Sequence, residues 1–412
     1  MRVVMIPFPI LRSNVLNIVK FLSRHRLIGA AILSVVLAAG CGPAPLGTSW
    51  AGLRVIGEEQ HILVAFNDRL ALVDPVDGKT VKLRNQEGEI RLDDQGNPRL
   101  WEIKQNANQF FAAPAPLDDG RLLAVTYNQV LYTIDLPTAR VENGSGTPIP
   151  NHNGHIVADL LEGDGLVYAG LSSKNLLALD AEDLSVVWTA QTEHGIWSKP
   201  LLVDDVLYAA SLDHYLYALD ARTGDLLWKL DIEGAAPSAP AYANGRLYIG
   251  SFARKIFEIS RQGQILNTYD TVDWVWGAPA VVDGILYAAD LVGNVYALDT
   301  TDGLREIWRV KASEMSIRPT PLVAGDYVLV ASRDQRLYWL KRSDGSMVMD
   351  NEGRPLLREM QGPIFSDILL IEPNEKTDIP GPYVIVSTLS PGQILVAYTL
   401  EQGRFLWTYS MQ

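Results

Sequence analysis

The sequence predicts an all-β fold, an eight-bladed β-propeller of four-stranded antiparallel blades over residues 50–412. Three observations predict it. A strand–turn–strand phrase recurs along the chain, its middle copies follow one another at intervals near 40 residues, and no stretch after residue 41 shows sustained helical periodicity. Four short strands per unit at this period are typical of a propeller.

The first forty residues have the features of an export signal. They contain five basic residues and no acidic residue, and the apolar run LIGAAILSVVLAAG leads directly to Cys41. A basic stretch, a short apolar run and small residues at its end predict a cleaved secretory signal peptide over residues 1–40. An uncleaved N-terminal anchor is the alternative.

Cys41 is the only cysteine of the chain. The segment LAAGC, residues 37–41, resembles the bacterial lipobox, which implies that Cys41 carries lipid and begins the mature protein. Residues 41–49 then form a lipidated tether. We expect an exported protein that is lipid-anchored to a bacterial membrane, on its periplasmic or cell-surface side.

The repeat is clearest in LYALDARTGDLLWKLD, residues 216–231, which is expected to form a strand, a tight turn and a second strand. Its template, A-x-D-x-x-x-G-x-x-x-W, fits eight times with varying completeness. The residues at the aspartate position are Asp74, Asp135, Asp180, Asp220, Ser260, Asp299, Lys341 and Thr399. Eight units predict eight blades.

Each unit also contains an earlier pair of strands. The segments WSKPLLVDDVLYAAS, PSAPAYANGRLYIGS and WGAPAVVDGILYAAD align without gaps, and Asn244-Gly245 and Asp283-Gly284 in their middles favour short hairpins. These strands are apolar on both faces, as expected for a blade that is covered by a neighbour on either side.

The recurring turn residues also have a structural explanation. The aspartate can accept hydrogen bonds from the backbone of the turn, and the glycine supplies a positive φ. The tryptophan is expected to fill the wedge between radiating blades, which requires a large apolar side chain. We therefore predict that four tryptophans dock neighbouring blades rather than contact a ligand: Trp188, Trp228, Trp308 and Trp407.

The phrase ALDARTGDLLW resembles the tryptophan-docking motif of the pyrroloquinoline-quinone-type repeat. Quinone-dependent dehydrogenases with this repeat carry adjacent cysteines and a calcium site, whereas this chain has one cysteine. His152 and His155 have a metal-like spacing but no third ligand nearby, and the sequence shows no phosphate loop or nucleophile elbow. We expect no catalytic residue, no cofactor and no metal site, and therefore not an enzyme.

The innermost strand of each blade is expected to begin at the mouth of the central channel. The residue three positions before the proline that precedes this strand would lie around that mouth. These residues differ in type from blade to blade: Trp50, Phe111, His155, Trp197, Pro237, Trp276, Arg318 and Gln361. Such a ring could determine which ligand or partner binds. Packing at the top of the seams between blades would explain the same residues equally well.

A lipobox followed by an eight-bladed propeller of this repeat resembles the BamB family, lipoproteins of the outer-membrane β-barrel assembly machinery. The resemblance implies a scaffold that docks to the periplasmic domains of the barrel protein. Its docking loops would carry a key arginine and two aspartates, and the corresponding loops here are DIEGAAPSAP and YDTVDWVWGAP. The second keeps Asp270 and Asp273, but the first offers Glu233 and no arginine.

We therefore expect a surface on the mouth face that binds a protein partner of the cell envelope. Its residues are Trp197, Asp270, Asp273, Trp274, Trp276 and Arg318. The alternative from another class is a module that binds a sugar or quinone over Trp197, Trp276 and Arg318, or a quinone-dependent redox module.

The charge of the chain also limits its partners. Without residues 1–40, the chain has 30 Lys and Arg against 48 Asp and Glu. This acidic surface repels phosphate backbones, so nucleic acid is not an expected partner. We expect a monomer.

Overall fold

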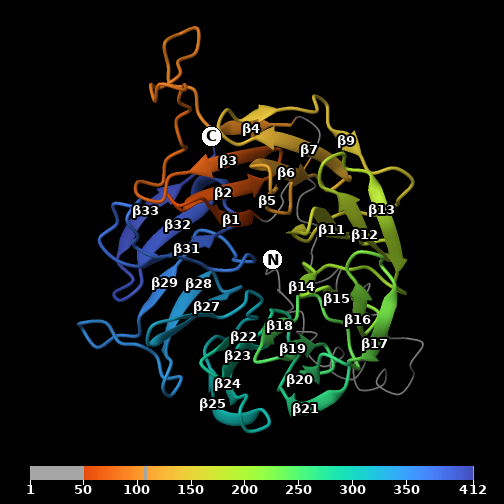
Figure 1. Ribbon diagram of the computed structural model, residues 1–412. Coiled ribbons are helices and arrows are strands. Elements are labelled where there is room, and N and C mark those ends of the chain that lie inside the picture. The colour runs from red at the N-terminus through yellow and green to blue at the C-terminus, as the bar shows by residue number, and fades with distance from the viewer. Residues whose placement is uncertain (1–50, 106–108, 412) are drawn as a thin grey trace, which may run out of the picture. The chain divides into compact units, whose positions relative to one another are not determined.

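Figure 1 shows the computed structural model, which describes residues 51–105 and 109–411. Eight antiparallel sheets follow one another around a central opening, from orange at blade 1 to blue at blade 8, which lies beside blade 1. The predicted eight-bladed propeller is confirmed. The predicted signal peptide, the tether with Cys41, and Trp50 lie outside the described residues and stay predictions.

Each blade is built from consecutive strands, with its first strand nearest the centre. Blade 1 contains β1 (Gly52–Ile56), β2 (His61–Phe66), β3 (Arg69–Val73) and β4 (Glu102–Lys104), and blade 2 contains β5 (Ala115–Pro116), β6 (Arg121–Val125), β7 (Val130–Asp135), β8 (Arg140–Val141) and β9 (Thr147–Pro148). Blade 3 contains β10 (Leu161–Gly163), β11 (Leu166–Gly170), β12 (Asn175–Asp180) and β13 (Val186–Gln191), and blade 4 contains β14 (Leu201–Val203), β15 (Val206–Ala210), β16 (Tyr215–Asp220) and β17 (Leu226–Asp231).

The second half of the ring repeats this order. Blade 5 contains β18 (Ala241–Ala243), β19 (Arg246–Ser251), β20 (Lys255–Ser260) and β21 (Ile265–Asp270), and blade 6 contains β22 (Ala280–Val282), β23 (Ile285–Ala289), β24 (Asn294–Asp299) and β25 (Arg305–Lys311). Blade 7 contains β26 (Leu322–Ala324), β27 (Tyr327–Ser332), β28 (Arg336–Lys341) and β29 (Leu357–Glu359), and blade 8 contains β30 (Leu369–Ile371), β31 (Tyr383–Ser387), the short 3₁₀ helix η1 (Pro391–Gln393), β32 (Leu395–Thr399) and β33 (Phe405–Tyr409). No helix of the described residues is long and apolar enough to cross a membrane.

The hydrophobic core is divided into eight clusters, one at each seam between neighbouring blades. The middle strands of a blade contribute side chains to the clusters on both of its sides, because successive side chains of a strand point to opposite faces. In β15, Tyr208 packs against blade 5 and Ala209 packs against blade 3. This arrangement explains why the sequence of these strands is apolar on both faces.

Blade 8 closes the ring on blade 1 through side chains. Every sheet of the described residues draws its strands from one continuous stretch of chain. At the closing seam, Ile62 and Val64 pack with Ile385 and Trp407. Closure therefore depends on apolar packing and on hydrogen bonds across this seam.

The tight turns follow the chemistry predicted from the repeat. Asp220 Oδ1 accepts hydrogen bonds from the backbone N–H groups of Arg222 at 3.0 Å and Thr223 at 2.9 Å. Gly224 has a φ of 75°, and a Cβ atom there would lie 2.6 Å from the ring of Trp188. Glycine is thus required both by the turn and by the indole that packs against it.

Blades 1, 2 and 7 depart from the regular pattern. The outer strand of blade 2 is split into β8 and β9, and the Asn143 side chain between them bonds the N–H of Thr133 and the carbonyl of Leu131. A hairpin arm, residues 80–101, is inserted between β3 and β4, and a shorter hairpin, residues 346–356, lies between β28 and β29. Figure 1 shows both projecting from the ring, in orange and in blue.

Candidate functional site

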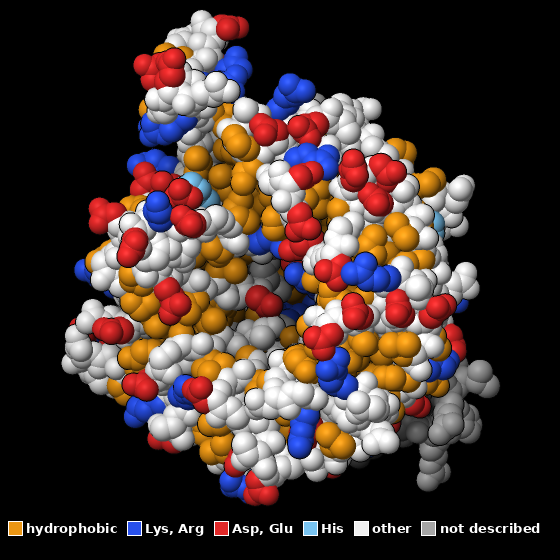
Figure 2. All heavy atoms as spheres, viewed as in Figure 1, with side chains coloured by type: hydrophobic (Ala, Val, Ile, Leu, Met, Phe, Trp, Pro, Cys, Tyr) orange, Lys and Arg blue, Asp and Glu red, His pale blue; other side chains and the backbone are white. Residues whose placement is uncertain are grey.

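A central cavity of about 420 Å³ lies where the innermost strands begin, and residues from all eight blades line it. Five of the eight residues that the sequence placed around the channel mouth line this cavity: Phe111, Trp197, Pro237, Trp276 and Arg318. Figure 2 shows acidic and basic side chains around the central hollow.

The sequence prediction was wrong for blades 3 and 8. Val157 and Phe365 line the cavity there, whereas His155 and Gln361 do not. Both blades lack the proline that marks the register of the innermost strands in blades 2 and 4 to 7, so the template was displaced along the chain.

A continuous aromatic ridge crosses the mouth face from blade 5 to blade 8. We define it by five residues: Phe252, Trp274, Trp276, Arg318 and Phe365. Phe252 stacks on Trp274 with ring centroids 4.7 Å apart and planes 11° apart, and it lies 5.6 Å from the ring of Trp276. The Arg318 guanidinium lies 4.3 Å from the ring of Trp276 and 5.3 Å from the ring of Phe365. Cation–π contacts of this kind hold the guanidinium in place.

The loop that carries Trp274 is fixed by backbone hydrogen bonds. The N–H of Val272 donates to the Tyr296 hydroxyl at 2.8 Å, and that hydroxyl donates to the buried Asp290 carboxylate at 2.7 Å. The N–H of Leu291 donates to the carbonyl of Trp274 at 2.9 Å. The ridge is therefore organised before any partner arrives, which reduces the entropy cost of binding.

The remaining predicted residues lie at different places. Asp273 pairs with Arg254, whose Nε lies 3.6 Å from its Oδ1, beside the ridge. Trp197 lines the cavity from blade 4. Asp270 ends β21, the outermost strand of blade 5, opposite Lys255, and it is not among the residues that line the cavity.

Sequence reasoning missed Phe252 and Phe365. Phe252 lies in the turn between β19 and β20, far from the ring template, and Phe365 lies in the blade where the template lost its register.

Charged residues of both signs line the cavity beneath the ridge. Asp159 accepts a hydrogen bond from the Ala113 N–H at 2.8 Å, and Asp367 accepts from the Thr320 N–H at 2.7 Å, so each carboxylate joins neighbouring innermost strands. Desolvation by the surrounding blades raises the pKa of both carboxyl groups, although Asp367 still reaches the water of the cavity. Burial, followed by the nearby Arg54, lowers the pKa of the Lys199 ammonium.

This arrangement offers groups that can recognise a partner or ligand. The ridge offers aromatic faces and a fixed guanidinium, and the cavity offers carboxylates already bound to backbone N–H groups. In the described part of the chain, no group of three or more His, Cys, Asp or Glu residues is arranged to hold a metal ion.

Tryptophans lie at the seams, where the sequence predicted them. Each indole N–H of Trp188, Trp228, Trp308 and Trp407 donates to a carbonyl of the next blade at 2.9 to 3.0 Å. The acceptors follow the aspartate position of the repeat: Ala221, Arg261, Arg342 and Pro75.

Two further tryptophans dock in the same way and were missed by the template. Trp101 donates to the carbonyl of Leu136 at 2.6 Å, and Trp339 donates to that of Leu400 at 2.7 Å. Trp101 is the last residue of the hairpin arm and Trp339 lies on β28, so neither stands at the expected spacing.

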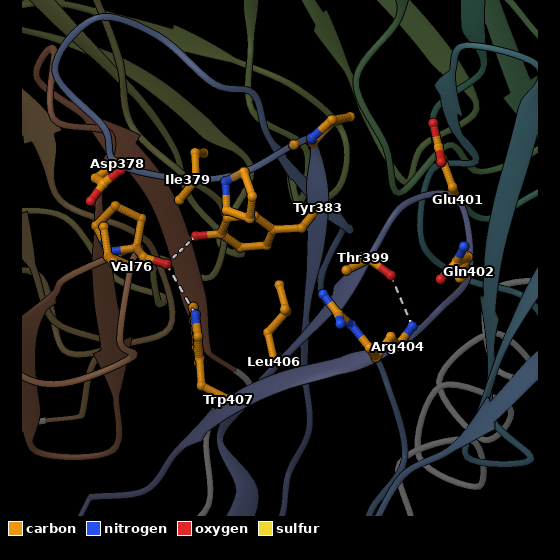
Figure 3. Close-up of a pocket in the computed structure, with 14 residues that line it drawn as sticks. Val76, Asp378, Ile379, Tyr383, Thr399, Glu401, Gln402, Arg404, Leu406 and Trp407 are labelled. Carbon is orange, nitrogen blue, oxygen red and sulfur yellow. Dashed lines mark hydrogen bonds between the residues drawn. The ribbon is translucent and has the colours of Figure 1, made fainter.

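A second cavity, of about 450 Å³, lies at the closing seam between blades 8 and 1 (Figure 3). Its wall contains Tyr383 and Trp407, whose hydroxyl and indole N–H both donate to the carbonyl of Pro75. Because these polar groups are already satisfied within the seam, they support ring closure rather than ligand recognition.

Comparison with protein families shows a match over most of the propeller. A family model described as outer membrane protein assembly factor BamB matches residues 151–351 and 258–412. BamB of Escherichia coli K12 is 38% identical over 78 residues, which cover 17% of this chain and 20% of that protein. BamB of Xanthomonas campestris is 31% identical over 104 residues, which cover 25% of each. These alignments span a quarter or less of the relatives' length.

Solved structures match the fold. The computationally designed protein Ika8 has a TM-score of 0.61 at 14% identity, over 86% of this chain and 96% of that one. BamB from Moraxella catarrhalis has a TM-score of 0.58 at 15% identity, over 84% of this chain and 96% of that one. A short segment is also 48% identical over 54 residues to the serine/threonine-protein kinase AfsK of Streptomyces coelicolor, 13% of this chain and 7% of that protein.

Proposed function

Because the chain belongs to the BamB family of outer membrane protein assembly factors, we propose that it is a non-catalytic scaffold of the cell envelope that holds a protein partner on its mouth face. The partner is a component of the outer-membrane assembly machinery, and its contact surface is the aromatic ridge with the adjoining Asp273.

The observation that carries this proposal is the composition and rigidity of the ridge. Three large aromatic side chains and a guanidinium stack without interruption across blades 5 to 7, and a fourth aromatic continues the stack onto blade 8. Trp and Arg are the residues most enriched at binding hot spots, where truncation often costs 2 kcal/mol or more. A ridge already stacked in the free protein loses little side-chain entropy on binding.

A lipid on Cys41 would place this face near a membrane. Ala51 lines the central cavity, so the chain enters the propeller on the mouth face. The ten residue-to-residue steps from Cys41 to Ala51 span at most about 35 Å when fully extended. A Cys41→Ser variant is expected to be released from membranes or to stay unprocessed, and membrane fractionation identical to the wild type would contradict the anchor.

The docking surface is tested by crosslinking capture of purified periplasmic domains of the barrel protein. The double variant Trp274→Ala/Arg318→Ala is expected to lose at least tenfold in capture while its thermal midpoint stays close to that of the wild type. The control is Lys79→Ala/Arg222→Ala, on exposed turns away from the mouth. If only the control variant lost the partner, the docking surface would lie on the opposite face of the propeller and the proposal would be wrong.

The non-catalytic part of the proposal is tested separately. Cys41 is the only cysteine, so the chain lacks the adjacent pair of quinone-dependent dehydrogenases. The purified protein with pyrroloquinoline quinone and calcium is expected to reduce no electron-acceptor dye when alcohols or sugars are added. Substrate-dependent turnover would instead establish the redox module.

A further inference from the structure

The hairpin arm is a feature that the scaffold function does not use. It is inserted into blade 1, outside the residues that match the BamB family model. Its base is anchored by the buried Leu83 and by Trp101, which is hydrogen-bonded to blade 2. Asn85 and Asp93 cap its two turns with side-chain hydrogen bonds to backbone N–H groups. The arm is therefore an organised structure.

Three short segments of the arm meet in a closed junction. The N–H of Leu83 donates to the carbonyl of Arg99, that of Arg99 to Arg91, and that of Arg91 to Leu83, at 2.8 to 2.9 Å. One backbone hydrogen bond thus joins Arg91 and Arg99, beside the bridge between Leu92 and Pro98. Like charges in such a pair repel each other, which destabilises the arm unless an anion lies between them.

A third arginine faces this pair from blade 2. Arg140, at the start of β8, lines the same cleft of about 450 Å³ as Arg91 and Arg99. Among the described residues, none of the three arginines forms an ion pair, although most other arginines do.

The cleft also contains two carboxylates, but each has another partner. Asp135 accepts from the N–H of Thr138 at 3.1 Å and from its hydroxyl. Glu142 lies 3.9 Å from Arg121. The two carboxylates reduce the positive charge of the cleft, but within the described ranges neither forms an ion pair with the three arginines, so the guanidinium N–H groups remain available to an incoming anion.

We infer that this cleft binds a phosphoryl group. One guanidinium fork is enough to pair with the two oxygens of a carboxylate, whereas a phosphoryl group offers three acceptor oxygens and up to two negative charges. Three arginines on two walls match the three oxygens of the phosphoryl group in number, and together they outnumber the two carboxylates of the cleft. The chain as a whole is acidic, with a net charge of −13, so this local basic site is not a consequence of overall composition.

The phosphoryl group has two possible sources, free phosphate and the headgroup of a membrane lipid. Titration of the full propeller with inorganic phosphate, followed by calorimetry, tests the first. Flotation with vesicles containing phosphatidic acid, against vesicles of phosphatidylcholine alone, tests the second.

The test variant is Arg91→Gln/Arg99→Gln, with Arg140→Gln as a second variant on the opposite wall. The control is Arg333→Gln/Arg404→Gln, which removes the same charge from two arginines outside the cleft. We expect the cleft variants to lose at least tenfold in affinity for whichever probe binds, and the control to lose less than twofold.

Binding of either probe with this pattern supports the site, and the probe that binds identifies the source. Failure of both probes to bind the wild type overturns the inference, as does equal loss in the control. Competition by acetate as strong as that by phosphate would also overturn it. None of these results depends on the protein partner of the mouth face, so the two proposals fail independently.

Discussion

The two halves of the ring use different means to fill the same wedge between blades. In the regular arc, blades 3 to 6, the outer strands β13, β17, β21 and β25 are six or seven residues long, and each has a register shift at the same place. In the irregular arc, blades 7, 8, 1 and 2, the outer strand is five residues or shorter, and in blade 2 it is split. Blade 8 is the intermediate case, because its short outer strand keeps the register shift and the tryptophan of the regular arc.

The docking tryptophan shows what this difference teaches. In three blades of the regular arc it lies on the outer strand, but in blade 7 it is Trp339 on the third strand and in blade 1 it is Trp101, at the end of the arm. All of them reach the same carbonyl position of the next blade. The ring therefore requires an indole at a point in space, and the chain can supply it from different points in the sequence.

The largest expected effect is loss of a tryptophan from the irregular arc. Trp339 and Trp101 are almost fully buried, whereas Trp228 of the regular arc is only partly buried. Trp339→Ala and Trp101→Ala should each lower the free energy of unfolding by about 3–5 kcal/mol, because a large cavity remains. Trp228→Ala should cost less, and Gln402→Ala on an exposed turn less than about 0.5 kcal/mol.

Urea unfolding measures these differences. If Trp339→Ala shifted the urea midpoint no more than Gln402→Ala, the inference that Trp339 docks neighbouring blades would be wrong.

The next effect concerns blade 5, which replaces the Ala–Trp pair of its neighbours by Glu258 and Asn267. The Asn267 side chain donates to the buried Glu258 carboxylate at 2.6 Å, and Arg246 pairs with the same carboxylate. Glu258→Ala alone should destabilise the fold, because it breaks this polar network.

Adding Asn267→Trp to Glu258→Ala should recover part of that loss, since the pair then matches blades 4 and 6. The expected coupling in a double-mutant cycle is about 1–3 kcal/mol. Purely additive losses of stability would show that blade 5 cannot accommodate the Ala–Trp pair that blades 4 and 6 use.

A smaller effect is expected at Asp367 in the irregular arc. Its pKa is raised in the folded state, so the ionised carboxylate costs stability above that pKa and the cost disappears as the pH falls below the unfolded value. Asp367→Asn keeps an acceptor for Thr320 and removes the charge. The variant should be more stable than the wild type at neutral pH, and the difference should vanish below about pH 4. A variant less stable at neutral pH would mean that the hydrogen bonds to the carboxylate outweigh its desolvation.

The smallest effect on stability is expected from the arm. Residues 84–98 bond mainly among themselves, and blade 1 is held by Leu83 and Trp101. Replacing residues 84–98 by a two-residue turn should change the free energy of unfolding by less than about 1 kcal/mol, because loop length has a weak effect on stability. A larger loss of stability in urea unfolding would make the arm part of the ring.

Sequence reasoning identified what repeats and missed what does not. Eight units were visible because the regular arc repeats the template with little variation, and the four predicted docking tryptophans lie in blades 3, 4, 6 and 8, which keep the tryptophan at the expected spacing. Leu160 and Ile368 replace the proline in blades 3 and 8, so the ring residues there were assigned to the wrong positions. The stack of Phe252 on Trp274 joins two blades, and no spacing along the chain could indicate it.

The central claim, that the mouth face of blades 5 to 8 holds the partner, is tested most directly by hydrogen–deuterium exchange. The full chain would be measured alone and with purified periplasmic domains of the barrel protein. The account predicts new protection in residues 271–276 and 313–318, next to the ridge, and none in the hairpin arm or in the turns at residues 75–78 and 221–224. Protection confined to the arm or to those turns, with the mouth loops unchanged, would contradict it.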